Sequence, residues 1–211
     1  MEEPKETGRI EAFSDGVFAV AITLLVLNLQ PPKPLQVDLV TWLVQQWPAY
    51  LAFVTSFATI GVMWMNHHRL FTYITRSDSG LMGLNLLLLM LIVLVPFPTA
   101  LLADYIAAPG PSFSWAQHIA AAVFNWTYVV LALCFNILWR YSTKKNRLLG
   151  NHVDRDAVQG ITKQYRWGPV CYLISFALAW LSVPASVVLN LLMAVYFALP
   201  PRKPSSLAKT E

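Results

Sequence analysis

Charged residues are scarce in this sequence. Only 12% of its 211 residues are Asp, Glu, Lys or Arg, and 56% are hydrophobic, whereas about 25% of the residues of an ordinary soluble domain are charged. Four stretches carry no charge at all, at residues 39–65, 79–103, 105–139 and 167–201. Uncharged stretches of this length exclude a soluble globular domain and predict an all-α protein that crosses a membrane several times.

Cysteine and secretory signals are also scarce or absent. The two cysteines, Cys134 and Cys171, both fall within uncharged stretches, which argues against a disulfide framework or a metal cluster. The first eight residues are polar, and no small-residue cleavage site follows a short apolar segment, so we expect no cleaved signal peptide. We expect no metal and no cofactor.

The N-terminal stretch 9–29 is the most informative part of the chain. It is apolar for twelve residues after Asp15, with Thr23 as the one polar exception. As an α-helix, its roughly 20 residues would span about 30 Å, the thickness of a hydrocarbon core. A helix that began at Asp15, with Ser14 as its cap, would reach only about 22 Å. Ser14 and Asp15 therefore lie within the first turns of a membrane helix, where an ionisable residue indicates a functional site.

Prolines and turn residues divide the chain into six expected spans. The second span begins near Pro48, Pro96 and Pro98 interrupt the third, and a fold-back at 182–184 separates the last two. We expect a single six-helix domain over residues 1–199, a short amphipathic segment at 35–46, and a disordered tail at 200–211. The expected spans are 9–29, 48–73, 81–102, 114–139, 165–181 and 185–199.

Basic residues predict the orientation of these spans. With six spans, both termini, the second–third loop and the fourth–fifth loop share one side, and 14 of the 15 Lys and Arg residues fall there; only Lys33 falls on the other side. The positive-inside rule makes that side cytoplasmic. We expect a multi-pass protein of the inner (plasma) membrane with both termini in the cytoplasm. The net charge of +4 then fits a lipid-facing rim and requires no nucleic acid as partner.

Helical spacing places part of the first span on one line, which we call the apolar stripe. An apolar stripe on a membrane helix ordinarily faces lipid or packs against a neighbour. Ser14 and Asp15 point away from it in two other directions. At 100° per residue, six positions fall within about 50° of a common line: Phe13, Gly16, Val20, Thr23, Leu24 and Leu27.

The carboxylate of Asp15 changes this ordinary interpretation, because a charge within a membrane must be matched by partners. Glu11, one turn earlier, can only repel it. A helix that is held from behind by polar contacts, while its apolar stripe stays free, suits the lining of a pore. Candidate partners on the same side of the membrane are Arg9, His67, His68, Arg69 and Asn85.

Motifs in the first three spans resemble those of a known family. Arg9-x-x-x-Phe13-Ser14-Asp15 in a first membrane helix resembles the signature of the transmembrane protein 175 family of potassium channels, in its single-repeat bacterial branch. The resemblance covers about residues 9–102; beyond them only the number of spans and the charge pattern agree. It continues in order through Trp64-x-x-His67-His68-Arg69-Leu70-Phe71, Asp78, Leu84-Asn85 and Pro96-Phe97-Pro98-Thr99.

The resemblance implies a homotetramer in which the first helix of each six-helix subunit lines a central pore. The family has no re-entrant carbonyl filter, and its selectivity comes from side chains of that helix. Its constriction positions correspond here to Val20, Leu24 and Leu27, and its layer of pore hydroxyls corresponds to Thr23. The first constriction residue in the family is usually Ile or Leu, so Val20 is a departure that bears on how tight this ring is.

We therefore expect a leak-type, potassium-permeable cation channel with a hydrophobic gate, whose partners are copies of itself, lipid, and potassium and other monovalent cations. A single layer of hydroxyls predicts modest selectivity for potassium over sodium. A polar network behind the pore helix would hold it in place, and we expect its role to be structural and coupled to pH through His67. The network positions are Arg9, Phe13, Ser14, Asp15, Trp64, His67, Arg69 and Asn85.

Two other classes of function stay open at lower rank. A proton or cation secondary transporter, or a proton pathway, would need ionisable or unwound groups near the midplane and usually an internal repeat, but the Phe-Ser-Asp motif occurs once. A membrane enzyme would need a nucleophile beside a base or metal ligands. Only Asp15, His67 and His68, with Ser14, approach such a set, so we expect no enzyme.

Overall fold

The computed structural model describes residues 6–29, 38–107, 115–151 and 153–199. Apart from one isolated antiparallel bridge between Ile74 and Leu149, the regular structure of these residues is helical. The elements are α1 (Gly8–Leu24), the 3-10 helix η1 (Leu25–Asn28), α2 (Leu39–Gln45), α3 (Trp47–Tyr73), α4 (Ser79–Leu94), α5 (Pro96–Ala107), α6 (Trp115–Thr143), the 3-10 helix η2 (Lys144–Asn146), α7 (Arg155–Leu178) and α8 (Val183–Ala198).

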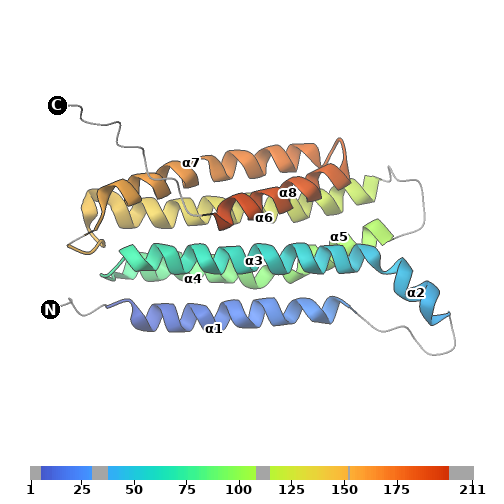
Figure 1. Cartoon of the computed structure of the whole chain (residues 1–211), viewed down its shortest axis with the longest axis horizontal. Coiled ribbons are helices and arrows are strands. Elements are labelled where there is room, and N and C mark those ends of the chain that lie inside the picture. The colour runs from blue at the N-terminus through green and yellow to red at the C-terminus, as the bar shows by residue number, and fades with distance from the viewer. Residues whose placement is uncertain (1–5, 30–37, 108–114, 152, 200–211) are drawn as a thin grey trace.

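The long helices lie side by side and alternate in direction (Figure 1). α1 forms one edge of the bundle, α3 and α4–α5 lie next to it, and α6, α7 and α8 form the other side. Within the described residues, four helical segments are long and apolar enough to cross a membrane: Gly8–Asn28, Trp47–Tyr73, Ser79–Ile106 and Trp115–Asn146. The prediction of an all-helical protein with several membrane-crossing helices is confirmed.

Helix boundaries follow from local chemistry. Asp78 caps α4 by accepting a hydrogen bond from the backbone N–H of Leu81 (2.8 Å), and Ser182 caps α8 in the same way through Ala185 (3.4 Å). The helix after Asp78 breaks at Val95, directly before Pro96, because proline lacks the N–H that would continue the ladder. α7 ends at Leu178 and α8 begins at Val183, so the expected fold-back at 182–184 is confirmed.

The expected amphipathic segment 35–46 lies partly outside the described residues, and the expected tail 200–211 lies wholly outside them.

The fifth expected span, 165–181, is wrong at its start, because α7 begins ten residues earlier at Arg155. Asp154 caps this extension by accepting from the backbone N–H groups of Asp156 (3.0 Å) and Ala157 (3.4 Å). The extension is amphipathic: it buries Ile161, while its basic residues stay on the outside. Because one face of this extension is charged, the sequence did not indicate that it is helical. Its other face packs against α6.

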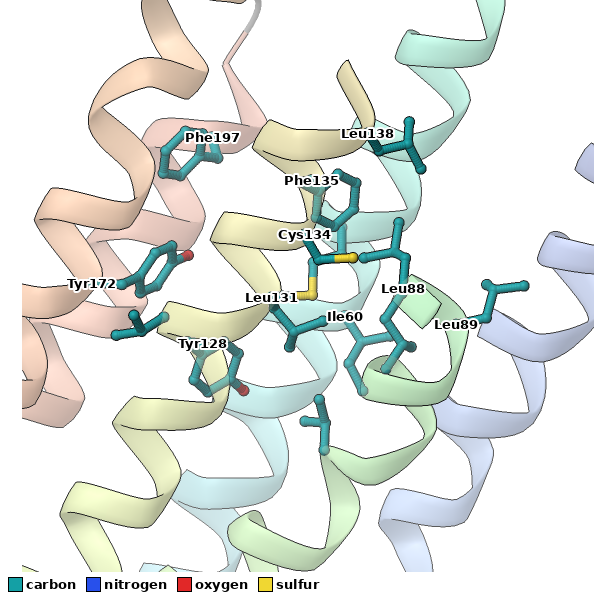
Figure 2. Close-up of a cluster of buried hydrophobic side chains, with 14 of the residues drawn as sticks. Ile60, Leu88, Leu89, Tyr128, Leu131, Cys134, Phe135, Leu138, Tyr172 and Phe197 are labelled. Carbon is teal, nitrogen blue, oxygen red and sulfur yellow. The ribbon is translucent and has the colours of Figure 1, made fainter. Parts of the chain in front are cut away.

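The core is built around α6. Figure 2 shows Leu131 and Cys134 of α6 among Ile60 and Leu88 of the neighbouring helices, with α7 and α8 on the opposite side of α6. Burying apolar side chains gives little driving force inside a membrane, so this tight interlocking stabilises the bundle mainly through van der Waals contact. α6 is accordingly the most buried of the four candidate spans, and α1 is the least buried.

One polar cluster ties the bundle together at the end where α1 begins and α8 ends. The Tyr141 hydroxyl donates to Asp78 Oδ2 (3.0 Å), and the guanidinium of Arg147 donates to the same oxygen and to the Tyr141 hydroxyl. The hydrogen bond from Leu81 N–H, followed by those from Tyr141 and Arg147, holds the pKa of the Asp78 carboxyl below its usual value, against a smaller opposing effect of burial. The ten Lys and Arg residues of the described part of the chain fall at the start of α1, at and just after the end of α3, from the end of α6 through η2, and in the first half of α7; these helix ends lie together in Figure 1.

We predict that Asp78→Ala lowers the melting temperature, because it removes a helix cap, which is worth about 0.5–2 kcal/mol, together with the contacts to Tyr141 and Arg147. The matched control is Asp38→Ala, which removes the cap of α2, where Asp38 accepts from the backbone N–H of Thr41 (3.0 Å) in a helix that has no buried residues. Thermal unfolding of the detergent-solubilised protein measures both.

The pH dependence has a definite sign. Because the folded-state pKa of Asp78 is lowered, its contribution to stability is complete above the unfolded value of about 3.9 and is lost as the pH falls through the folded value. The wild type should therefore lose more stability than Asp78→Asn on acidification from about pH 5 to pH 3. Equal losses would contradict the assigned role of this carboxylate.

Candidate pore helix and its anchoring network

α1 buries only one narrow face in the subunit. Its fully buried side chains are Ser14, Phe18 and Ala21, followed by Leu25 in η1. These positions recur every three or four residues and therefore lie on one side of the helix. α1 packs mainly on α3 and α4, so most of its circumference is left uncovered within the subunit.

A chain of hydrogen bonds joins α1 to α3 and α4 in the buried interior. His67 Nε2 lies 2.9 Å from Asn85 Oδ1, Asn85 Nδ2 donates to Ser14 Oγ (3.0 Å), and Ser14 Oγ donates to the carbonyl of Ile10 (2.7 Å). Because the Asn85 amide nitrogen is the donor to Ser14, its oxygen accepts, which assigns the proton to His67 Nε2. Each of the three donor atoms in this chain has an acceptor, as an apolar surrounding favours.

Aromatic rings fix the position of the imidazole. The ring of His67 stacks on Phe71 (centroids 4.5 Å apart) and meets the edge of Phe18 from α1 (5.4 Å). His67 is 1% exposed. The imidazole therefore acts as a rigid spacer between α1 and α3 as well as a hydrogen-bond donor.

Asp15 is bound separately, at the surface of the subunit. Trp64 Nε1 donates to Asp15 Oδ1 (2.8 Å), and the Trp64 ring stacks on His68 (6.3 Å between centroids). Asp15 is exposed, in contrast to the buried Ser14 beside it. The Ser-Asp pair thus makes two different contacts with α3 and α4, one inside the subunit and one at its surface.

Both ends of the α1–η1 segment are also fastened. At its start, the backbone N–H of Glu6 donates to the carbonyl of Thr75 (3.0 Å), and the Thr7 hydroxyl lies between two acceptors, Glu11 Oε1 (2.8 Å) and the carbonyl of Ile74 (3.2 Å). At its far end, Asn28 Nδ2 donates to the carbonyl of Pro96 (3.2 Å), at the break between α4 and α5. Polar contacts therefore set the height and the rotation of α1 along its whole length.

The apolar stripe lies on the uncovered side. Phe13, Val20, Leu24 and Leu27 are 57%, 54%, 37% and 64% exposed, and Gly16 and Thr23 are exposed as well. The Thr23 hydroxyl donates its hydrogen to the carbonyl of Val20 (2.9 Å), which leaves the lone pairs of its oxygen free. Leu27 lies in η1, beyond the last residue of α1.

Three of the expected network positions lie apart from these contacts. Arg9 and Phe13 are exposed on α1. Arg69 Nη2 instead donates to the carbonyl of Ala198 (3.4 Å) and Nη1 to that of Leu199 (3.5 Å), at the end of α8. Asn66 contributes there too, since its Nδ2 donates to the carbonyl of Phe197 (3.2 Å).

Several anchoring residues escaped the sequence reasoning. Thr7, Phe18 and Asn28 belong to no motif, and each acts through a contact with a segment distant in sequence. Trp64 stood among the network positions, but its pairing with Asp15 was not foreseen. A polar residue at the end of an otherwise apolar span is the one signal that could have pointed to Asn28.

The sequence and the structure of this chain are similar to those of known proteins. The model of the family described as the endosomal/lysosomal potassium channel TMEM175 matches residues 9–96. A potassium channel of Chamaesiphon minutus is 50% identical over 200 residues, which cover 93% of this chain and 96% of that protein. The chain belongs to the TMEM175 family. A potassium channel of Streptomyces collinus is 43% identical over 194 residues, 91% of each protein.

The likeness extends to the fold. The crystal structure described as a lysosomal potassium-selective channel TMEM175 homolog from Chamaesiphon minutus matches with a TM-score of 0.81 and 48% identity, covering 92% of this chain and 96% of that one. The TMEM175 family consists of ion channels and not of enzymes. Its matched segment contains α1, α3 and α4, the helices that carry the Ser14–Asn85–His67 chain.

We predict that Asn85→Ala destabilises the protein by about 1–3 kcal/mol, because it leaves the buried Nε2–H of His67 without an acceptor. Asn28→Ala is the matched control, since it also removes one asparagine bond from α1 to a neighbour but leaves no buried partner side chain unpaired. Thermal unfolding in detergent distinguishes the two. An Asn85→Ala protein that melts with the wild type would contradict the role given to this hydrogen-bond chain.

Proposed function

We propose that this protein is a potassium-permeable cation channel of the leak type, formed by four copies whose α1 helices surround a common pore. The observation that carries the proposal is the exposure of the apolar stripe on α1, the candidate membrane span that the subunit buries least. The names of the bacterial relatives, both potassium channels, support potassium as the permeant ion.

Exposure on α1 has three possible explanations: lipid, a neighbouring subunit, or a pore. Lipid alone does not account for Asp15, whose carboxylate accepts a hydrogen bond from the Trp64 indole at the surface of α1. An exposed ionised group in contact with hydrocarbon is costly. If α1 instead meets other copies around an axis, Asp15 and Trp64 are enclosed between subunits, and the apolar stripe on the adjacent side faces the axis. This arrangement supports the tetramer that the family resemblance implies.

The gate in this proposal consists of the rings of Val20, Leu24 and Leu27. A narrow ring of aliphatic side chains excludes water and therefore ions, since an ion that loses its hydration shell there gains nothing in return. Opening requires α1 to turn or move outward enough to admit a partly hydrated cation. Val20 is smaller than Ile or Leu, so at equal spacing of the four helices its ring would leave a wider opening than a ring of Ile or Leu.

Thr23 supplies the proposed selectivity layer. Its hydrogen is bound to the carbonyl of Val20, so four hydroxyl oxygens would present lone pairs at one level of the pore. One neutral ring replaces only part of a hydration shell, and modest preference for potassium over sodium follows. Ser14, Asp15, Trp64, His67 and Asn85 do not touch the ion in this proposal; they hold α1 from behind.

The membrane arrangement belongs to the same proposal. Six crossings would add α7 and α8 to the four candidate spans, and the alternating directions of the helices (Figure 1) support this number. The end that collects the basic residues would then be cytoplasmic, in the inner (plasma) membrane.

We expect purified protein in sealed liposomes to carry potassium and caesium inward along their gradients faster than sodium. The measurement is cation-driven flux, reported by a dye that follows the compensating proton movement after addition of an ionophore. Liposomes that stay closed to potassium would overturn the channel proposal. Proton movement without the ionophore and without potassium would favour the proton pathway instead.

We predict that Leu27→Ala increases leak current about tenfold or more, because it widens an apolar constriction. The matched control is Val26→Ala, which trims a side chain on the same segment that is also exposed (52%) but points about 110° away from the centre line of the apolar stripe. Single-channel or liposome flux recordings compare them. Equal currents from both variants and the wild type would place Leu27 off the pore.

A further inference from the structure

α6 and α7 pack against each other in opposite directions, on the side of the bundle away from α1 (Figure 1). Two hydrogen bonds between them fix their register. Asn136 Nδ2 donates to the carbonyl of Tyr165 (2.7 Å), and Trp139 Nε1 donates to Thr162 Oγ1 (2.9 Å). Each step toward the C-terminus of α6 therefore matches one step toward the N-terminus of α7, and Arg140 lies level with the residue before Thr162.

One side of this contact is exposed and forms a continuous strip along both helices. Trp126 and Arg140 of α6 lie within about 40° of each other around the helix, as do Phe176 and Thr162 of α7. The rings of Trp126 and Phe176 meet (centroids 5.5 Å apart), so the two faces adjoin. We call this surface the α6–α7 strip. The rotation per residue also assigns to it five exposed residues: Leu133, Lys144, Arg155, Arg166 and Leu173.

Four cations, two from each helix, gather at the basic end of the α6–α7 strip. Arg140 and Lys144 are four residues apart on α6, where like charges repel each other. Arg166 lies about five residues, or about 7.5 Å, from the level of Arg140 along the bundle. Arg147 is paired with Asp78, whereas the cations of the strip have no such partner among the described residues.

The acidic residues nearest in sequence do not neutralise this group. Asp154 and Asp156 lie at the start of α7, where Asp154 caps the helix. Both are about 15 Å or more from Arg166 along the axis, and Asp156 points about 80° away from it. The two carboxylates therefore lie at the aqueous end of the strip and leave Arg166 and the adjacent Arg140 for an external anion.

Toward the middle of the bundle the α6–α7 strip becomes apolar. Leu133, Leu173 and Trp126 are 43%, 50% and 49% exposed, and they follow the cations along the same side of the two helices. A phospholipid has this same order of chemistry, with a charged headgroup at the surface of the bilayer and hydrocarbon chains below it. A soluble anion would use the cations alone and would leave the apolar part of the strip without a purpose.

We propose that the α6–α7 strip binds an anionic phospholipid, whose phosphodiester lies between Arg140 and Arg166 and whose acyl chains lie along the apolar part of the strip. A guanidinium group matches the geometry of a phosphate and binds it through paired hydrogen bonds. A zwitterionic phospholipid binds less tightly, because its ammonium group is repelled by the same cations. Only the assignment of this lipid to the cytoplasmic leaflet rests on the proposed orientation; the site itself does not depend on the pore.

The test is native mass spectrometry of the full-length protein in detergent, titrated with phosphatidylglycerol or with phosphatidylcholine of the same acyl chains. We expect phosphatidylglycerol to bind at least tenfold more tightly, with a difference that shrinks as the ionic strength rises. Glycerophosphoglycerol, which is the headgroup without its chains, should compete only at more than a hundredfold higher concentration. Equal binding of the two lipids would overturn the proposal, and equally strong competition by glycerophosphoglycerol would show a site for soluble anions instead.

Single substitutions locate the site. Arg140→Gln and Arg166→Gln should each weaken the binding of phosphatidylglycerol about fivefold and leave that of phosphatidylcholine unchanged, while Arg140→Lys should retain part of the affinity because it keeps the charge. The matched control is Arg9→Gln, which removes the same charge from an exposed position of α1 at the opposite edge of the bundle and should change the affinity less than twofold.

All three positions are exposed, so the melting temperatures of the lipid-free variants should match that of the wild type and show that each variant is folded. A loss in Arg9→Gln as large as that in Arg140→Gln would mean that the lipid responds to the general surface charge. That result, or unchanged binding in both Arg140→Gln and Arg166→Gln, would contradict a site on the α6–α7 strip.

Discussion

The hydrogen-bond chain from His67 through Asn85 to Ser14 determines how α1 is turned, and the rest of the arrangement depends on it. In an apolar surrounding, a broken hydrogen bond is not replaced by one to water. A rotation of α1 by one residue, about 100°, would separate Ser14 from Asn85 and carry the carboxylate of Asp15 toward the core. Because Ser14 must face inward, the face that carries Val20 and Leu24 must face outward.

α3 connects this helix to the other half of the subunit. On one side it presents His67 and Trp64 to α4 and α1, and on another it presents Asn66 and Arg69 to the last carbonyls of α8. Those carbonyls have no partner within their own helix, so the amide and guanidinium groups complete the end of α8. A displacement of α8 would therefore act on the same helix that positions α1.

Much of the fold could be predicted from the sequence, because charge-free stretches and prolines mark membrane helices without tertiary information. The apolar stripe could be predicted too, since it needs only the rotation per residue. The pairing of Asp15 with Trp64 could not, because it depends on the distance between two helices. The prediction that Arg69 belongs to the same network as His67 was wrong for a different reason. Arg69 follows His67 by two residues, about 200° around the helix, so the rotation per residue already excluded that the two side chains share one face of α3. The early start of α7 could not be predicted, because the charged residues of an amphipathic helix end are also typical of a polar loop.

The tightly wound turn Leu25–Asn28 has a geometric consequence for Leu24, which directly precedes it, and for Leu27 within it. In a 3-10 helix, residues three apart stand directly above one another and are about 6 Å apart along the axis, whereas an α-helix sets them about 60° out of line and about 4.5 Å apart. The side chains of Leu24 and Leu27 therefore lie directly above one another along the helix axis. Relaxation of this single turn to α-helical winding would swing Leu27 sideways by about 60° while Ser14 and its hydrogen bonds stayed still. The end of α1 that carries Ser14 can thus remain fixed while the turn at its other end changes its winding, a change that would strain the hydrogen bond from Asn28 to Pro96.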